Sequence, residues 1–176
     1  TPVSAYLHAA AMVKAGVYLV MRLAPGLADV EPWRPLVATA AVVTMLLGGV
    51  QALRQHDLKL VLAHGTVSQL GFMILLAGAG TRDAALAAAG LVVAHALFKA
   101  CLFLVVGIID RRAGTRDLRE LSGLGRRAPL LAAVGMLGAA SMAGVPPLLG
   151  FVTKEASFEA FLDAVDPMIE FLDSQG

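Results

Sequence analysis

Long apolar segments alternate with short polar connections along most of the chain. A helix needs about 20 mostly apolar residues to cross the hydrocarbon core of a bilayer, and five segments approach or exceed that length. They are residues 3–22, 36–53, 58–79, 84–109 and 129–153. The pattern therefore predicts an all-α, polytopic membrane helix bundle of about five transmembrane helices, with at least one broken helix.

The connections carry residues that end helices, and their basic residues predict an orientation. Residues 24–35 hold three prolines and Trp33, an aromatic residue suited to the membrane interface. Residues 110–127 hold six arginines, which places this loop in the cytoplasm because cytoplasmic loops carry an excess of Arg and Lys. Alternation of the helices then puts 54–57 on the same side, and 24–35 and 80–83 on the opposite side.

The last apolar segment contains a break. The stretch "GVPPLLG" (144–150) puts two prolines, Pro146 and Pro147, and two glycines inside an apolar run. Backbone groups freed at membrane depth must be buried in protein or line a wet cavity, and transporters place ion sites at broken helices. We therefore expect Lys154, which follows the break, to lie near freed carbonyl groups. Alternatively, the two prolines merely end a helix.

The C-terminal stretch, residues 156–176, differs from the apolar segments. From residue 155 onwards, acidic and apolar positions recur at intervals of three and four, which is typical of an amphipathic helix. We expect an acidic amphipathic tail, interrupted or kinked near Pro167, that forms a surface helix or is poorly ordered. The sequence thus predicts two parts, a membrane domain over residues 1–155 and this tail.

Composition supports a membrane protein and excludes several other classes. Hydrophobic residues make up 58% of the 176 residues and charged residues only 15%, with a mean hydropathy of +0.77. Soluble domains usually carry about 25% charged residues. The net charge of +1 gives no case for nucleic-acid binding. The single cysteine, Cys101, excludes an internal disulfide framework and a cysteine-rich metal site.

The sequence also lacks the motifs of common active sites. It contains no P-loop, no glycine-rich dinucleotide fingerprint, no nucleophile elbow and no cluster of metal ligands. We therefore expect no metal, no cofactor and no redox or hydrolytic centre on this chain. Because it opens at Thr1 with no charged leader, we expect it to be a piece of a longer protein.

Charged residues are sorted by type, and this sorting indicates proton transfer. All ten arginines and all thirteen acids lie in connections, at the ends of apolar segments or in the tail. Lysines and histidines also occur within or beside the apolar runs, at Lys14, Lys99, Lys154, His8, His64 and His95. Arginine stays charged under almost all conditions, whereas a buried lysine or a histidine can release a proton near neutral pH. Ionisable groups inside a membrane are candidates for function, so these residues predict a proton relay.

Some of the polar residues have a simpler explanation. His64 can hydrogen-bond a neighbouring helix, and Lys59, at the start of an apolar segment, can extend its ammonium group to the membrane interface. Thr66, Ser68 and Gln69, inside the third apolar segment, can bind water or a neighbouring helix. Interfacial extension accounts poorly for the other three lysines, which recur in three different segments.

Four stretches of the sequence resemble a known family. They are TPVSAYLHAAAMVKAGVYL (1–19), DLKLVLAHGTVSQLGF (57–72), HALFKACLF (95–103) and SMAGVPPLLGFVTKE (141–155). In this order they are similar to the proton-translocating antiporter-like subunits of Mrp-type cation/proton antiporters, respiratory complex I and membrane-bound hydrogenases. The loop GIIDRRAGTRDLREL (107–121) is most similar to the large A-type subunit of the Mrp antiporters, in which Asp-His-x-x-Gly-Thr-Arg-Asp is typical.

The resemblance implies a fold and a mechanism. Members of the family contain two inverted five-helix repeats, each forming a half-channel, joined at mid-membrane by a row of lysines and histidines. Lys99 matches the central lysine of the second repeat, His95 the relay histidine one turn earlier, and Lys154 the lysine beside the broken helix. Lys14 and His8 match the last helix of the first repeat. The other helices of that repeat, with their glutamate–lysine pair, are absent from this chain.

The chain departs from the family pattern at positions that matter for transport. Leu91 stands where a second relay histidine is usual, and His64 and Gly65 stand where tyrosine and serine are usual. Leu148 and Leu149 replace the common phenylalanine and asparagine after the two prolines, which makes the break less polar. Because Leu91 cannot carry a proton, a third hypothesis is that the chain belongs to a structural subunit that has lost transport.

The resemblance implies a subunit of a multisubunit monovalent cation/proton antiporter in the plasma membrane of a bacterium, a secondary transporter and not an enzyme. Its partners would be the other subunits of the complex, the lipid bilayer, protons and monovalent cations such as Na+ or K+, with no nucleic acid. The alternative is a proton-translocating membrane subunit of a complex I-like or hydrogenase-like redox pump, in which this chain would carry no redox centre.

Overall fold

The computed structural model describes the backbone of residues 12–27, 30 and 32–173, and the side chains of these residues up to 165. Within this part, the chain forms seven helices and no strands. They are α2 (Met12–Leu27), α3 (Trp33–Leu53), α4 (Leu58–Gly78), α5 (Arg82–Ala113), α6 (Leu124–Arg127), α7 (Pro129–Ala143) and α8 (Leu149–Asp173). The all-α fold predicted from the apolar segments is confirmed.

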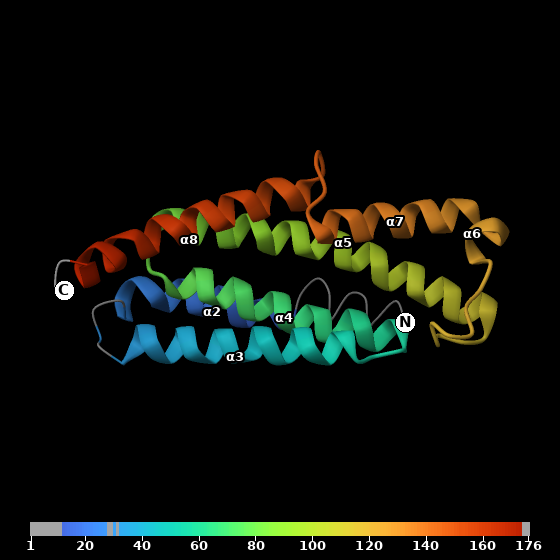
Figure 1. Ribbon diagram of the computed structural model, residues 1–176, viewed down its shortest axis with the longest axis horizontal. Helices are drawn as coiled ribbons and strands as arrows, with labels where there is room; N and C mark the ends of the chain where they lie inside the picture. Colours follow the sequence, from blue (N-terminus) through green and yellow to red (C-terminus); the bar gives the residue numbers. More distant parts are fainter. Residues whose placement is uncertain (1–11, 28–29, 31, 174–176) are drawn as a thin grey trace.

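Helix α5 is the central helix of the bundle. It packs against α4 on one side and against α7 and α8 on the other, and α4 in turn packs against α2 and α3. Figure 1 shows the long helices running along one axis, with α7 and α8 following each other along α5. With 32 residues and a rise of 1.5 Å per residue, α5 is about 48 Å long. It therefore extends well beyond a hydrocarbon core of about 30 Å.

Three of the helices, α3, α4 and α5, are long and apolar enough to cross a membrane. Helix α2 is described over 16 residues, because the first apolar segment begins outside the described part of the chain. The apolar segment predicted over 129–153 contains two helices, one on each side of the predicted break. Helix α7 covers only 15 residues and ends at Ala143, and a new helix, α8, begins at Leu149.

The connection between α7 and α8 has a local physical cause. Gly144 ends α7 with a φ of 85°, a left-handed conformation that glycine adopts without a Cβ clash. Pro146 and Pro147 follow, and a proline has no N–H to donate to a helix. The chain resumes its helical course only at Leu149, so the predicted break is confirmed, with one helix ending and another beginning around it.

The other helices begin and end at residues that satisfy free backbone groups. The Asp57 side chain accepts hydrogen bonds from the first N–H groups of α4, and Thr81 does the same for α5. Helix α5 ends at Ala113, and the capping residue that follows it, Gly114, has a φ of 72°. These caps fix where α4 starts and where α5 starts and ends, and therefore the positions of the site residues along both helices.

The turn before α4 and the basic loop, residues 110–127, lie at the same end of the bundle, as predicted. The Leu58 N–H donates to the Arg116 carbonyl at 3.1 Å, and the Leu118 N–H donates to the His56 carbonyl at 2.9 Å. Figure 1 shows the last turn of α2, the first turn of α3 and the α4–α5 connection at the opposite end. The predicted alternation of the connections is therefore confirmed.

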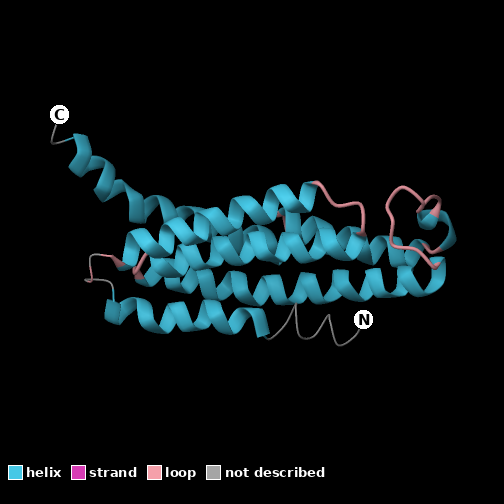
Figure 2. Ribbon diagram, turned by 90° about the horizontal axis from the view of Figure 1, so that it is seen from below, coloured by secondary structure: helices cyan, strands magenta, loops and turns pink. Residues whose placement is uncertain are grey.

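Helix α8 runs from the break into the predicted tail without interruption, through Pro167 to Asp173. The helical structure expected for the tail is confirmed over this range, whereas an interruption at the proline is not observed. Ser157 and Ala160 are buried, and Ala160 packs against α5, so the first turns beyond residue 155 belong to the bundle. Figure 2 shows the C-terminal end of the helix bending away from it.

Candidate functional site

Lys99 is completely buried in α5, with 0% of its surface exposed. Its Nζ donates a hydrogen bond to the Leu62 carbonyl oxygen of α4 at 3.0 Å. A Cβ placed on Gly65 would lie 3.3 Å from the same nitrogen, so the absence of a side chain there gives the amine room against α4. A buried amine needs a polar partner, and the backbone of the neighbouring helix supplies it.

The polar residues of α4 face in different directions. The Thr66 hydroxyl is buried and donates to the Leu62 carbonyl at 2.7 Å, which is the oxygen that Lys99 also uses. Ser68 instead faces α3, since its Oγ would lie 3.6 Å from a Cβ on Gly49. The Gln69 Oε1 is buried without a hydrogen-bond partner among the described residues. Of the three, only Thr66 is shown to share a partner with Lys99.

His95 lies one helical turn before Lys99 and is also completely buried. Its ring meets Phe98 edge-on, with ring centres 5.2 Å apart. Neither ring nitrogen has a hydrogen-bond partner among the described residues. A neutral imidazole has one donor and one acceptor nitrogen, and among the described residues neither is used.

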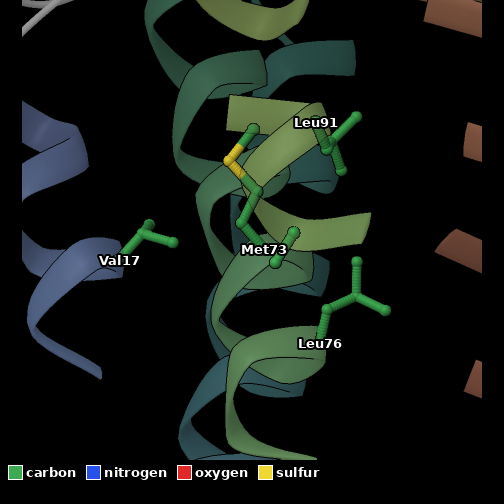
Figure 3. Close-up of a cluster of buried hydrophobic side chains, with 5 residues drawn as sticks. Val17, Met73, Leu76 and Leu91 are labelled. Carbon is green, nitrogen blue, oxygen red and sulfur yellow. The ribbon is translucent and has the colours of Figure 1, made fainter. Parts of the chain in front are cut away.

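Helix α2 brings a second lysine to this region. Lys14 is buried, with 6% of its surface exposed. Val17, one turn further along α2, packs in the same cluster as Leu91 of α5 (Figure 3), which lies one turn from His95. The structure thus gathers Lys14, His95 and Lys99 from two helices that are remote in sequence. His8, predicted to belong to the same relay, lies outside the described residues.

Lys154 forms a separate site at the break between α7 and α8. Its Nζ donates to the Met142 carbonyl oxygen at 2.7 Å, and Met142 lies in the last turn of α7. A Cβ on Gly144 would lie 3.1 Å from Cδ of Lys154. The expected contact between this lysine and a carbonyl freed at the break is confirmed. Pro146 and Pro147 lie in the connection and create the break.

A cavity of about 530 Å³ opens beside α4. Its lining includes Val13 of α2 and Phe103 of α5, and along α4 it includes His64 and Thr66. The Nδ1 of His64 is 2.9 Å from the Leu60 carbonyl oxygen of the same helix. His64 therefore makes a hydrogen bond within its own helix, and its ring lines the cavity.

Charged residues gather at the end of this cavity near the basic loop. The Nε of Arg116 lies 3.3 Å from Oδ2 of Asp57 and 3.8 Å from Oδ1 of Asp110. Asp57 caps α4 and Asp110 lies near the end of α5, so Arg116 joins the two helices that hold Lys99. Both Asp57 and Arg116 line the cavity. No group of His, Cys, Asp and Glu side chains suited to a metal ion is found among the described residues.

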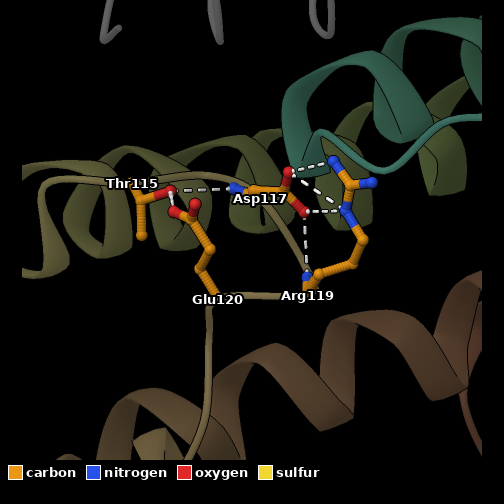
Figure 4. Close-up of polar contacts among 4 residues, drawn as sticks. All are labelled: Thr115, Asp117, Arg119 and Glu120. Carbon is orange, nitrogen blue, oxygen red and sulfur yellow. Dashed lines mark hydrogen bonds and ion pairs between the residues drawn. The ribbon is translucent and has the colours of Figure 1, made fainter.

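The rest of the basic loop is held by its own polar contacts (Figure 4). The Thr115 hydroxyl donates to Glu120 at 2.7 Å. The Asp117 carboxylate accepts from the backbone N–H and the guanidinium of Arg119, with the shortest contact at 2.6 Å. These hydrogen bonds from Arg119 lower the pKa of Asp117 to about 2. Asp117 is therefore ionised at all physiological pH values.

We expect the substitution Asp117→Asn to loosen the loop, because an amide loses the ion pair with Arg119. Trypsin should then cleave after the loop arginines several-fold faster in vesicles that expose the loop. The stabilisation by a carboxylate of lowered pKa is present above the ordinary value of about 4 and is lost as the pH falls toward 2. The effect of Asp117→Asn should therefore be fully developed at neutral pH.

The matched control is Asp163→Asn, the same exchange at an exposed position on α8. It should leave the cleavage rate in the loop unchanged. Equal cleavage of Asp117→Asn and the parent protein would show that the ion pair does not hold the loop.

Several groups at these sites carry no signal in the sequence. Lys99 and Lys154 each donate to a backbone carbonyl. Every residue has a carbonyl, so the sequence does not show which carbonyl will bind a lysine. Arg116 forms an ion pair with Asp57, which lies 59 positions earlier in the chain. From the sequence, the basic loop that contains Arg116 predicted only the orientation of the helices. Gly65 had a weak signal, since a glycine inside an apolar helix often marks close approach of another group.

The chain is similar to known proteins over most of its length. A family model described as "NADH:quinone oxidoreductase/Mrp antiporter, TM" matches residues 1–173. A probable K(+)/H(+) antiporter A/B-type subunit of Rhizobium meliloti is 48% identical over 170 residues, which cover 96% of this chain and 17% of the relative. The A-type subunit of an Na(+)/H(+) antiporter of Alkalihalophilus pseudofirmus is 47% identical over 180 residues, covering 94% and 22%.

A solved structure is also similar. The Mrp complex from Dietzia sp. contains a chain with 52% sequence identity and a TM-score of 0.84, over 92% of this chain and 18% of that one. The present chain thus spans about a fifth of the length of the proteins that it matches.

Proposed function

Because the chain belongs to the family of NADH:quinone oxidoreductase and Mrp antiporter transmembrane proteins, we propose that it is part of the large A-type subunit of a multisubunit monovalent cation/proton antiporter. The antiporter would lie in the plasma membrane of a bacterium and exchange protons for Na+ or K+. Its other subunits and the lipid bilayer would be the partners of this segment. The role is that of a secondary transporter and not of an enzyme.

The observation that carries the proposal is the burial of Lys99 against the Leu62 carbonyl, at 3.0 Å. A carbonyl oxygen accepts a hydrogen bond from either the ammonium or the neutral amine, so both protonation states fit the site. No acidic side chain holds the nitrogen as an ion pair among the described residues. Lys99 can therefore gain and lose a proton without breaking a salt bridge.

We assign the remaining relay residues from their surroundings. His95, with both ring nitrogens unpartnered among the described residues, would pass protons between Lys99 and Lys14. His8 would extend the relay beyond Lys14. Lys154, held at the break by the Met142 carbonyl, would exchange protons with water and mark the end of the path.

The other predicted residues would have supporting roles. Thr66 would orient the Leu62 carbonyl, which it shares with Lys99. Ser68 and Gln69 would line the helix interfaces and bind water, and Pro146 and Pro147 would keep the break open. In this proposal residues 1–155 form the transporting part, and residues 156–176 extend α8 as an acidic tail.

The alternative function is that of a subunit of a redox-driven proton pump, because the family also includes NADH:quinone oxidoreductase. Two observations favour the antiporter. The similar curated proteins are named as antiporter subunits, and the loop residues Gly114, Thr115, Arg116 and Asp117 fit the Mrp pattern. In either complex this chain would be a subunit without a redox centre.

The test expresses the full set of antiporter genes in a sodium-sensitive bacterial host that lacks its own antiporters. We expect the parent genes to restore growth at high sodium, and Lys99→Ala to abolish that growth while the complex still assembles. Failure of the parent complex to restore growth at high sodium or high potassium would contradict the antiporter proposal. Full growth with Lys99→Ala would contradict the role of Lys99.

A further inference from the structure

A groove of about 430 Å³ lies between the second half of α5 and the beginning of α7. Figure 1 shows these two helices side by side. Leu104 of α5 and Leu130 of α7 line the groove and are 50% and 78% exposed. The described residues therefore leave this apolar surface uncovered. The large apolar side chains of the lining are Leu104, Val105, Ile108, Leu130, Leu131 and Val134.

One end of the groove is basic. Arg112, in the last turn of α5, lines the groove and is exposed. Arg127 directly precedes Ala128, which lines the same end. No carboxylate forms an ion pair with either arginine among the described residues. A basic residue in the last turn of a helix is favoured by the helix dipole, but that effect leaves most of the positive charge free to bind an anion.

The groove runs from the end of the bundle to its middle. Arg112 and Cys101 are eleven residues apart on α5, which is about 16 Å along the helix axis. Helix α7 runs in the opposite direction, and the Cys101 Sγ lies 3.9 Å from the Val134 carbonyl oxygen. Half of a hydrocarbon core of about 30 Å is about 15 Å. The groove therefore spans one leaflet, from the level of the basic loop to the middle of the membrane.

The lining favours a lipid over a transmembrane helix as the occupant. Transmembrane helices pack through small residues that let their backbones approach, and α3 and α4 of this chain do so. A Cβ on Gly48 would lie 2.6 Å from the Ser68 nitrogen, and one on Gly71 would lie 2.7 Å from the Met45 nitrogen. The groove has no glycine in its described lining, and its apolar residues are large and branched. Such a surface fits an acyl chain, which needs neither close backbone approach nor a polar partner.

We propose that this groove binds an anionic phospholipid of the cytoplasmic leaflet, with one acyl chain along the apolar walls and the phosphate at Arg112. The guanidinium can donate two parallel hydrogen bonds to phosphate oxygens, and Arg127 adds positive charge at the same end. Basic pockets between transmembrane helices on the cytoplasmic side are suited to such headgroups. The bound lipid would hold the start of α7 against α5. The inference goes beyond the proposed function, because it requires the orientation in the membrane but no transport.

The site is tested with photoactivatable phospholipids in vesicles that contain the full assembled complex. Two lipids carry the same diazirine-bearing acyl chain, one with the anionic phosphatidylglycerol headgroup and one with the zwitterionic phosphatidylcholine headgroup. After illumination, peptide mass spectrometry measures the labelling of residues 101–112 and 128–134. We expect phosphatidylglycerol to label them about fivefold more, the ratio that corresponds to about 1 kcal/mol for one arginine near an anionic headgroup.

Variants of Arg112 test its role in this preference. Arg112→Gln removes the charge but keeps a long polar side chain, and it should abolish the preference for phosphatidylglycerol. Arg112→Lys should retain most of the preference, because an ammonium group also attracts phosphate, although as a point charge. The matched control is Arg82→Gln, the same exchange at an exposed position at the opposite end of α5. It should leave the preference unchanged.

Three results overturn the proposal. Equal labelling by the two lipids in the parent complex is the pattern of non-specific contact with bulk lipid. An absence of labelling by both lipids means that another segment of the full-length protein or another subunit covers the groove. An undiminished preference in Arg112→Gln means that the phosphate does not lie at Arg112.

The parent complex decides the question if Arg112→Gln fails to assemble. An excess of unlabelled phosphatidylglycerol should then reduce the labelling of the groove, whereas the same excess of phosphatidylcholine should not. Equal competition by the two lipids overturns the site. Because the labelling needs no transport, its failure is distinguishable from failure of the sodium-resistance test of the proposed function.

Discussion

Lys99→Arg is expected to reduce cation-coupled proton transport by the complex to the level of vesicles that lack the complex. Arginine keeps its proton under almost all conditions, so it cannot alternate between charged and neutral forms. The site also fits a single amine, because Nζ lies 3.0 Å from the Leu62 carbonyl and 3.3 Å from the position of a Cβ on Gly65. A guanidinium is wider and would push α4 and α5 apart.

The measurement is the rate at which added Na+ or K+ dissipates a pH gradient in inside-out vesicles, normalised to the amount of assembled complex. Lys99→Met, a neutral chain of similar length, separates chemistry from size: it should assemble normally and still fail to transport. Arg126→Lys exchanges one cation for another at an exposed position and should keep full activity. If Lys99→Arg transports as well as the parent protein, Lys99 is not a relay residue.

Gly150→Ala is expected to prevent stable assembly of the complex. Helix α8 crosses the end of α7 at this position so closely that a Cβ on Gly150 would collide with the Ser141 carbonyl oxygen and lie 2.8 Å from its carbonyl carbon. Backbone atoms cannot turn aside as a side chain can. Overpacking commonly costs about 1–3 kcal/mol, and because backbone must move here we expect the upper end of that range or more. The shift would also separate Lys154 from the Met142 carbonyl.

The amount of complex that survives extraction and heating in detergent measures this effect. Gly125→Ala provides the matched control, because a Cβ there meets nothing within 4 Å, and it should leave the yield unchanged. A normal yield and melting temperature for Gly150→Ala would show that α7 and α8 do not approach as described.

The apolar segments predicted most of the helices because burial in lipid depends on a property that each segment carries by itself. Twenty apolar residues in a row are sufficient to cross a bilayer, whatever lies beside them. The charge of the basic loop also predicted that residues 54–57 and 110–127 lie at the same end of the bundle. This prediction was possible because the number of Arg and Lys residues is a property of each loop by itself. The structure of the tail was harder to predict from the sequence. Residues 156–173 continue α8, and the first turns of this stretch pack against α5, a contact that the sequence does not indicate.

The site was predicted only in part. Lys99 and His95 stood out because ionisable residues are rare inside apolar segments. Thr66, Ser68 and Gln69 looked equivalent in sequence, yet Thr66 faces the lysine while Ser68 faces α3. Which side of α4 meets which neighbour depends on how the helices are rotated against one another, and a nearly uniform apolar surface does not indicate that rotation.

By itself, the sequence determined that the chain is a bundle of membrane helices, that it breaks at Pro146 and Pro147, and that it carries lysines and histidines in apolar segments whose interiors contain no arginine. The tertiary structure decided what holds those groups. Lys99 and Lys154 are bound by the carbonyls of Leu62 and Met142. The physical reason is that hydropathy and proline act locally, whereas a carbonyl is common to every residue and becomes a binding group only when another helix packs beside it.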